Sequence, residues 1–243
     1  MRCQLLLFLL LLAASPILGQ SVSADTSFVG LAATQAVRVY ERAFPDKPHL
    51  NNGTEYIRYD YRITGHPYFL TDSTLTGYIQ YNDVRYHDVA MRHDIVRDEV
   101  LIDQIDKLFR IRLHSERVDS FSLGPHRFIR LVADSLSNNG IRTGFYQVLY
   151  DGSVRLLAKR VKTIHEDISS GKYKANFEEN DRFFVQTNDG TYHEIKSQQS
   201  LFGLFPDQEK TLRRYLRTNG IKFRKQRELA ITGVVKQYDA LAR

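Results

Sequence analysis

The sequence contains no tryptophan, one cysteine, two methionines and only six prolines among its 243 residues. A single cysteine cannot form an intramolecular disulfide, which excludes a disulfide-stabilised scaffold. The 14 glycines and six prolines are far too few for a collagen-like repeat. Hydrophobic residues make up 42% of the chain and charged residues 26%, close to the averages for globular proteins. We therefore expect a folded protein with a hydrophobic core, built as one domain or two small ones.

A long apolar run occurs only at the N-terminus. Arg2 supplies a positive start, and residues 5–14 are continuously apolar. Small residues follow at Gly19 and Ala24, where a signal peptidase would cleave. The run is too short to cross a bilayer, which takes about 20 residues. The pattern predicts a secretory signal peptide over residues 1–19, with cleavage after Ala24 as the second choice.

The only cysteine, Cys3, precedes this apolar run. A lipoprotein cysteine would follow the run, at the cleavage point, so we expect no lipid anchor. Cleavage after Gly19 would leave a cysteine-free chain with a net charge of +5, without thiolate nucleophiles or cysteine metal sites. No later stretch reaches 18 apolar residues. These features predict a periplasmic or secreted protein without a transmembrane segment after the signal peptide.

The middle of the chain has the period-two pattern of strands. Residues 55–63, 74–81 and 84–91 alternate apolar and polar side chains, and Asn82-Asp83 supplies a turn between the last two. Further strand-like runs occupy 93–102, 108–113, 120–123, 127–132, 144–149, 154–162, 182–187 and 192–196. Short strands at regular spacing, without helices between them, indicate an antiparallel sheet.

Helical spacing predicts three helices, over residues 27–43, 207–218 and 226–241. The expected fold is α+β, with an N-terminal helix, a curved antiparallel β-sheet or partial barrel of several hairpins, and a C-terminal helical pair. The expected organisation is a signal peptide (1–19), a strand-rich domain with the N-terminal helix (20–203), and a basic helical pair (204–243) packed on the same domain.

Four blocks, at residues 77–89, 91–99, 148–157 and 204–207, carry a resemblance. Together with the two terminal helices, they resemble a group of uncharacterised secreted or periplasmic proteins of Gram-negative bacteria, with a strand-rich body and a Lys/Arg-rich helical tail. The resemblance implies the fold and the location and adds no activity. His93 stands where that pattern has Tyr or Phe, which favours a structural role for it.

The sequence lacks the sharp catalytic signatures. It has no Gly-x-Ser-x-Gly, no phosphate-binding glycine loop and no His-Glu-x-x-His. A hydrolase with a dispersed Asp/Glu/His site remains the alternative hypothesis, and a deep polar pocket holding several of its candidates would favour it. These candidates are His87, His93, Asp94, Asp98 and Glu99. A calcium site formed by carboxylates of residues 94–106 is a further alternative, but solvated carboxylates are the simpler interpretation. We expect no cofactor and no metal.

The most unusual feature is a basic segment near the C-terminus. Eight cations fall within 18 residues that contain no acid: Lys210, Arg213, Arg214, Arg217, Lys222, Arg224, Lys225 and Arg227. Such a concentration of positive charge is typical of surfaces that bind polyanions, although a merely solvated helix face is the simpler alternative. We therefore expect a non-catalytic envelope protein that binds anionic lipid, lipopolysaccharide or an envelope protein. We expect no nucleic acid partner in an exported location.

Overall fold

The computed structural model describes Leu31, Ala32, Gln35, Val39, Leu50 and residues 52–103, 110–133, 140–167, 169 and 173–241. The chain divides into two compact units, Met1–Pro45 and Asp46–Arg243. The predicted signal peptide lies outside the described residues. The predicted helix over 27–43 lies outside them too, except for four isolated positions. Both stay predictions, and everything below concerns the second unit.

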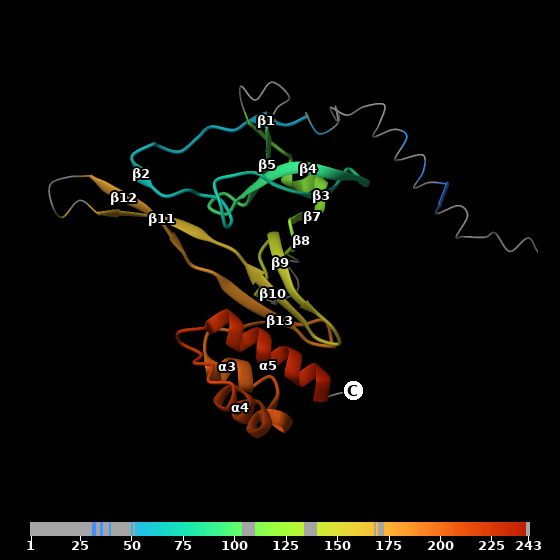
Figure 1. Ribbon diagram of the computed structural model, residues 1–243, viewed down its shortest axis with the longest axis vertical. Coiled ribbons are helices and arrows are strands. Elements are labelled where there is room, and N and C mark those ends of the chain that lie inside the picture. The colour runs from blue at the N-terminus through green and yellow to red at the C-terminus, as the bar shows by residue number, and fades with distance from the viewer. Residues whose placement is uncertain are drawn as a thin grey trace, which may run out of the picture. The chain divides into compact units, whose positions relative to one another are not determined.

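Eleven strands form one antiparallel sheet (Figure 1). In spatial order they are β1 (Thr54–Glu55), β6 (Arg110–Arg112), β5 (Glu99–Asp103), β4 (Val84–Asp94), β3 (Leu75–Tyr81), β7 (Val118–Leu123), β8 (His126–Leu131), β9 (Gly144–Asp151), β10 (Arg155–Lys159), β13 (Arg182–Gln186) and β14 (Tyr192–Glu194). The predicted antiparallel sheet is confirmed. Within the described residues, the end strands β1 and β14 do not pair with each other, so the sheet stays open.

Local turn chemistry explains the hairpins that the sequence predicted. Asn82 and Asp83, between β3 and β4, have φ values of 50° and 63°. Two consecutive residues with positive φ make the primed turn that matches the twist of paired strands, and Asn and Asp tolerate this conformation. The β4–β5 connection was predicted wrongly, because residues 93–102 are not one strand. They contain the end of β4, a turn over residues 95–98, and β5.

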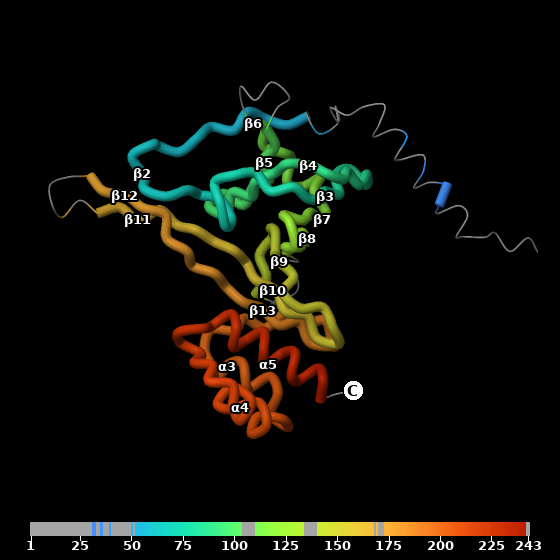
Figure 2. The backbone as a smooth tube through the Cα atoms, in the orientation of Figure 1, coloured from blue at the N-terminus to red at the C-terminus, as the bar shows by residue number. Residues whose placement is uncertain are grey.

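The strand predicted over residues 55–63 is also wrong. Only β1 (Thr54–Glu55) and β2 (Ile63–Thr64) are strands there. The predicted buried face is largely exposed, since Ile57 is 77% and Tyr61 94% exposed, whereas Tyr56 on the opposite face is buried. β2 instead pairs with β12 (Lys174–Glu179), which pairs with β11 (Lys162–Asp167), so a second, three-stranded sheet forms (Figure 2).

Two clusters of apolar side chains make up most of the core. The first is formed by side chains from strands β3 to β9. It contains Ile79, Tyr81, Phe121, Phe128 and Phe145, each at most 1% exposed. The second joins β10 and β13 to three helices, α3 (Gln198–Phe202), α4 (Glu209–Thr218) and α5 (Arg227–Leu241). A short 3₁₀ helix, Pro206–Gln208, leads into α4, and another, Ser115–Arg117, precedes β7.

The last two helices pack closely because α5 carries a glycine at the contact. A Cβ atom at Gly233 would come within 3.0 Å of the ring of Tyr215 on α4. Glycine in a helix is less favourable than alanine by about 1 kcal/mol. At position 233 this cost is offset because the absence of a side chain lets α4 and α5 approach closely. Leu212 and Leu216, the buried residues of α4, belong to the second core cluster together with the buried face of α5.

A buried carboxylate fixes α5 to the β9–β10 hairpin. Asp239 is 1% exposed and accepts hydrogen bonds from the Tyr150 hydroxyl at 2.5 Å and from the Ser153 backbone N–H at 3.0 Å. The Ser153 hydroxyl donates to the same carboxylate. Because a buried carboxylate requires donors, these contacts couple helix docking to the conformation of the hairpin loop.

Replacing Tyr150 by Phe is expected to lower the free energy of unfolding by about 1.5 kcal/mol, because it removes a donor to a buried charge. Urea denaturation followed by circular dichroism measures the change. Tyr173→Phe is the matched control. Its hydroxyl also donates to a carboxylate, Glu166 at 3.1 Å, but Tyr173 is 42% exposed, so a change below about 0.5 kcal/mol is expected. Equal effects of the two substitutions would contradict this role for Asp239.

Candidate functional site

The cations of the basic C-terminal segment lie on α4 and on the loop that follows it. The stripe formed by Leu212 and Leu216 faces the core, which leaves the opposite side of α4 to solvent. Seven of the eight cations are exposed: Lys210, Arg213, Arg214, Arg217, Lys222, Arg224 and Lys225. We call these seven residues the basic surface. Figure 1 shows α4 on the far side of α5 from strands β10 and β13.

The eighth cation, Arg227, has a different environment. It is only partly exposed, its Nη2 donates to the Ile195 carbonyl at 2.6 Å, and its guanidinium lies 5.3 Å from the ring centre of Phe183. Arg227 therefore holds the start of α5 against β13 and the chain after β14. The sequence grouped it with the others because spacing does not show which side chains turn inward.

Most of the basic surface carries uncompensated charge. Arg213 forms an ion pair with Glu209 at 2.7 Å, and its guanidinium lies 4.3 Å from the ring centre of Phe202. The other six cations form no ion pair with any carboxylate in the described part of the chain. Like charges held together repel one another, and a ligand that brings negative charge relieves this repulsion.

The candidates for a hydrolase site have different environments in the described structure. Of His87, His93, Asp94, Asp98 and Glu99, only Glu99 lines the pocket described below. His87 is exposed on β4. The side chain of His93 has no exposed surface, and its ring lies 5.1–5.7 Å from the rings of Phe121, Phe128 and Phe145. A histidine enclosed in this way cannot reach a substrate, which agrees with the structural role that the resemblance implies.

Asp94, at the end of β4, has a structural environment as well. It is buried and accepts hydrogen bonds from the Tyr56 hydroxyl at 2.8 Å and from the backbone N–H groups of Val96 and Arg97 at 2.9 and 3.1 Å. Burial, and then the charge of Asp94, raise the pKa of Tyr56 well above its usual value. The carboxylate therefore fixes the β4–β5 turn and anchors the segment after β1.

Asp98, the last residue of that turn, belongs to a network that crosses the sheet. Its carboxylate contacts His93 Nε2 at 3.0 Å, accepts the Phe145 backbone N–H at 3.0 Å and forms an ion pair with Lys159. Lys159 Nζ also donates to the Phe145 carbonyl at 3.1 Å. Gly144 has a φ of 150°, which L side chains rarely adopt, and a Cβ atom there would also displace the side-chain ends of Asp98 and Lys159. We call these contacts the Asp98 network.

The network joins strands that are distant in the sheet. Asp98 follows β4, Phe145 lies on β9 and Lys159 ends β10, while β3, β7 and β8 lie between β4 and β9. Flat strands spaced about 4.8 Å apart would place β4 and β9 about 19 Å from each other. The sheet must therefore bend to bring these side chains together, and the network holds the bend.

Burial and ion pairing have opposite effects on the pKa values of Asp98 and Lys159. Burial by itself raises the pKa of Asp98, but the contacts with His93 and Lys159 outweigh it and hold this pKa below its usual value. Burial lowers the pKa of Lys159, and the charge of Asp98 offsets only part of that effect. The side chains of Asp98 and Lys159 are 23% and 13% exposed. The network is thus a largely enclosed ion pair.

Three of the carboxylates considered for calcium form ion pairs, and Asp94 instead accepts the Tyr56 hydroxyl and backbone N–H groups. Asp103 pairs with Arg92 at 2.7 Å and with Arg110 at 3.5 Å, and Asp98 pairs with Lys159. Asp106 lies outside the described residues. Among the residues that the structure describes, no three His, Cys, Asp or Glu side chains come together as metal ligands.

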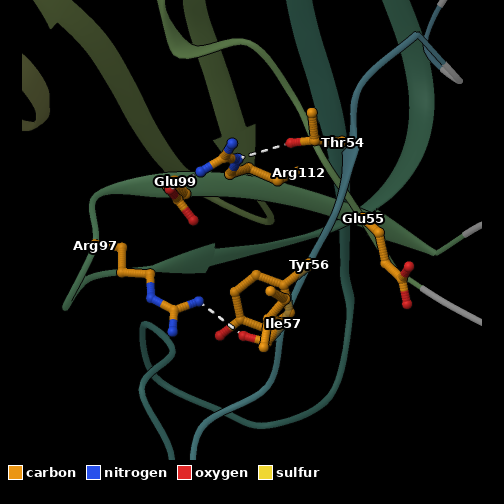
Figure 3. Close-up of a pocket in the computed structure, with 7 residues that line it drawn as sticks. All are labelled: Thr54, Glu55, Tyr56, Ile57, Arg97, Glu99 and Arg112. Atoms are coloured by element: carbon orange, nitrogen blue, oxygen red, sulfur yellow. Dashed lines mark hydrogen bonds and ion pairs between the residues drawn. The ribbon is translucent and has the colours of Figure 1, made fainter.

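A pocket of about 330 Å³ opens where β1, at the edge of the sheet, meets β5 and β6 (Figure 3). We call it the edge pocket. It is lined by Thr54, Glu55, Tyr56, Ile57, Arg97, Glu99 and Arg112. Arg112 donates to Thr54 Oγ1 at 3.0 Å and to Glu99 Oε1 at 2.9 Å. The sequence analysis did not predict this pocket, because its walls come from three separate segments.

None of the helices in the described residues combines the length and the apolar character needed to span a membrane. Comparison with known proteins found no matching family model, no matching curated protein and no matching solved structure.

Proposed function

We propose that this protein is exported, is not an enzyme, and binds a phosphate-bearing lipid surface through the basic surface. The observation that carries the proposal is the gathering of seven exposed cations on one helix and the loop after it. Each basic side chain near an anionic membrane contributes about 1 kcal/mol. Four of the seven are arginines, whose planar guanidinium matches the geometry of phosphate. Residues 1–19 and the resemblance to secreted proteins support the export.

An exposed apolar side chain that follows the cations in the sequence favours a lipid surface over an acidic protein. Leu229, in the first turn of α5, is 52% exposed and follows the basic loop by four residues. Cations that flank an exposed apolar group suit the boundary between headgroups and acyl chains. An acidic protein would supply the charge without a use for Leu229. Binding of acidic proteins only would therefore contradict the proposal.

Cosedimentation with vesicles tests the proposal. The probes are vesicles of phosphatidylcholine alone, vesicles of phosphatidylcholine with phosphatidylglycerol, and purified lipopolysaccharide. We expect binding to one or both of the anionic probes at low salt, and the comparison between them identifies the source of the phosphate. Binding should weaken as salt is raised, because exposed charges are screened over about 8–10 Å at physiological ionic strength. Equal binding to all vesicles, or binding that salt leaves unchanged, would overturn the proposal.

A further inference from the structure

The edge pocket contains a carboxylate with one unsatisfied oxygen and a guanidinium that pairs with no carboxylate in the described residues. Glu99 Oε1 accepts from Arg112, but Glu99 Oε2 is buried and has no hydrogen-bond partner within the described residues. A buried carboxylate oxygen without a donor is destabilising. The Glu99 carboxylate, which lines the pocket, therefore has acceptor capacity that Arg112 does not satisfy.

The second group is Arg97, in the β4–β5 turn. Its Nη1 donates to the Ile57 carbonyl at 2.8 Å, and its guanidinium lies 4.2 Å from the ring centre of Tyr59 and 5.3 Å from that of Tyr56. These contacts fix its orientation, yet in the described residues it pairs with no carboxylate. A guanidinium held in place with unused N–H groups is prepared to bind an anionic group such as a carboxylate.

Figure 3 shows how the groups are arranged. The Glu99 side chain lies between Arg112 and Arg97, the ring of Tyr56 lies beside the end of Arg97, and Glu55 points away from the others. The space between the two guanidinium groups is thus occupied by the protein's own carboxylate. A ligand that carries only negative charge would meet Glu99 there, and repulsion would oppose its binding.

The pocket also has an apolar wall. Ile57 is 77% exposed, one of the most exposed large hydrophobic side chains in the described residues, and it lines this pocket. Covering it would remove apolar surface from water, which favours binding. A volume of about 330 Å³ is at the small end of ligand pockets. The ligand is therefore small, with an apolar portion.

We propose that the edge pocket binds a small zwitterion, an amino acid or short peptide with an apolar side chain. Its ammonium group pairs with the Glu99 carboxylate, its carboxylate accepts from Arg97, and its side chain covers Ile57. This site is separate from the basic surface, and neither proposal depends on the other.

A matched set of four compounds tests the zwitterion requirement. L-Leucine carries both charges, 4-methylpentanoate lacks the ammonium group, 3-methylbutylamine lacks the carboxylate, and L-leucylglycine separates the two charges by a peptide unit. Titrations followed by the backbone amide resonances of residues 54–57 measure affinity at this site. We expect L-leucine or L-leucylglycine to bind about tenfold more tightly than either singly charged analogue, since each lost charged contact costs about 1.5 kcal/mol. Whichever of L-leucine and L-leucylglycine binds more tightly shows whether the pocket prefers a free amino acid or a peptide.

Variants locate the binding. Glu99→Gln removes the negative charge and Arg97→Met removes the guanidinium. Each substitution should weaken the binding of L-leucine or L-leucylglycine about tenfold. Glu116→Gln is the control, because Glu116 is exposed in the 3₁₀ helix Ser115–Arg117 and does not line the pocket, and this variant should bind like the wild type. A thermal melt of each variant verifies folding, and Arg97→Met keeps the test valid if Glu99→Gln fails to fold. The proposal is overturned if no compound perturbs these resonances, if 4-methylpentanoate binds as well as L-leucine, or if both variants bind normally.

Discussion

Replacing Asp98 by Asn is expected to lower the free energy of unfolding by about 3 kcal/mol. The substitution keeps the shape of the side chain but leaves Lys159 as an enclosed charge without its counter-charge, and breaking such buried pairs costs about 3–5 kcal/mol. We choose the lower end because the Asp98 side chain retains 23% exposure. Urea denaturation monitored by circular dichroism provides the measurement.

The backbone supplies a matched control for this substitution. Asp98 has φ 60° and Asp83 has φ 63°, so both aspartates occupy the left-handed region, which Asn also tolerates. Asp83 is exposed in the β3–β4 turn. Asp83→Asn is therefore expected to change stability by less than about 0.5 kcal/mol. Similar losses at both positions would show that the turn conformation, and not the Asp98 network, is responsible.

A double substitution separates the unpaired charge from the loss of packing. Lys159→Met removes the charge that Asp98→Asn leaves alone and keeps most of the aliphatic side chain. The double variant is expected to be more stable than Asp98→Asn alone, because two neutral side chains carry no penalty for an enclosed, unpaired ammonium group. A double variant at least as unstable as the sum of the single variants would contradict the ion-pair explanation.

The stabilisation that Asp98 provides should depend on pH in a defined direction. The pKa of Asp98 lies below its usual value in the folded protein, so its stabilisation is complete above the unfolded pKa of about 4. That stabilisation is lost as the pH falls through the lower folded pKa. The difference in unfolding free energy between the wild type and Asp98→Asn should therefore shrink below about pH 4. A difference that stays constant into that range would argue against an ionised Asp98 in the network.

Replacing Lys210, Arg214 and Arg217 by Gln is expected to weaken binding to phosphatidylglycerol vesicles by about two orders of magnitude at low salt. The three residues are spaced four and three apart along α4, so they share one stripe of its exposed side. At about 1 kcal/mol each, their removal costs about 3 kcal/mol of binding free energy. Folding should hardly change, because the stripe lies opposite Leu212 and Leu216.

A variant with the same net charge controls for the overall electrostatic effect. Arg58, Arg117 and Lys174 are exposed and lie far from α4 in the sequence. Replacing them by Gln removes the same three charges from other surfaces, and binding should weaken less than about threefold. Equal weakening by both triple variants would show that net charge, and not the basic surface, attracts the membrane. If neither triple variant weakens binding, the cations of α4 only solvate the helix and do not bind the membrane.

Features set by neighbouring residues were predictable from the sequence. The Asn82-Asp83 turn depends on the conformations that two residues tolerate, and the strands on either side pair as predicted. The two C-terminal helices follow from apolar spacing over a few turns. The basic segment required only that α4 bury one stripe, since helical geometry then places the remaining cations outward.

Contacts between distant segments were decided by the tertiary structure. The alternation over residues 55–63 is typical of a strand, but a strand needs a neighbour, and along most of this segment the chain has none within the described residues. The Tyr56 side chain therefore turned inward to Asp94, 38 residues away. The sequence also grouped His93, Asp98 and Glu99; the fold keeps His93 and Asp98 in contact but places Glu99 in the edge pocket.

The sequence by itself determined the α+β class, the C-terminal helices and the concentration of positive charge, because these depend on local propensity and periodicity. Only the tertiary structure decided that Asp98 meets Lys159, 61 residues further on, and that Glu99, Arg97 and Arg112 line one pocket. These placements depend on the bend and register of an eleven-stranded sheet. Bend and register are set by the packing of the whole core, which no short stretch of sequence encodes.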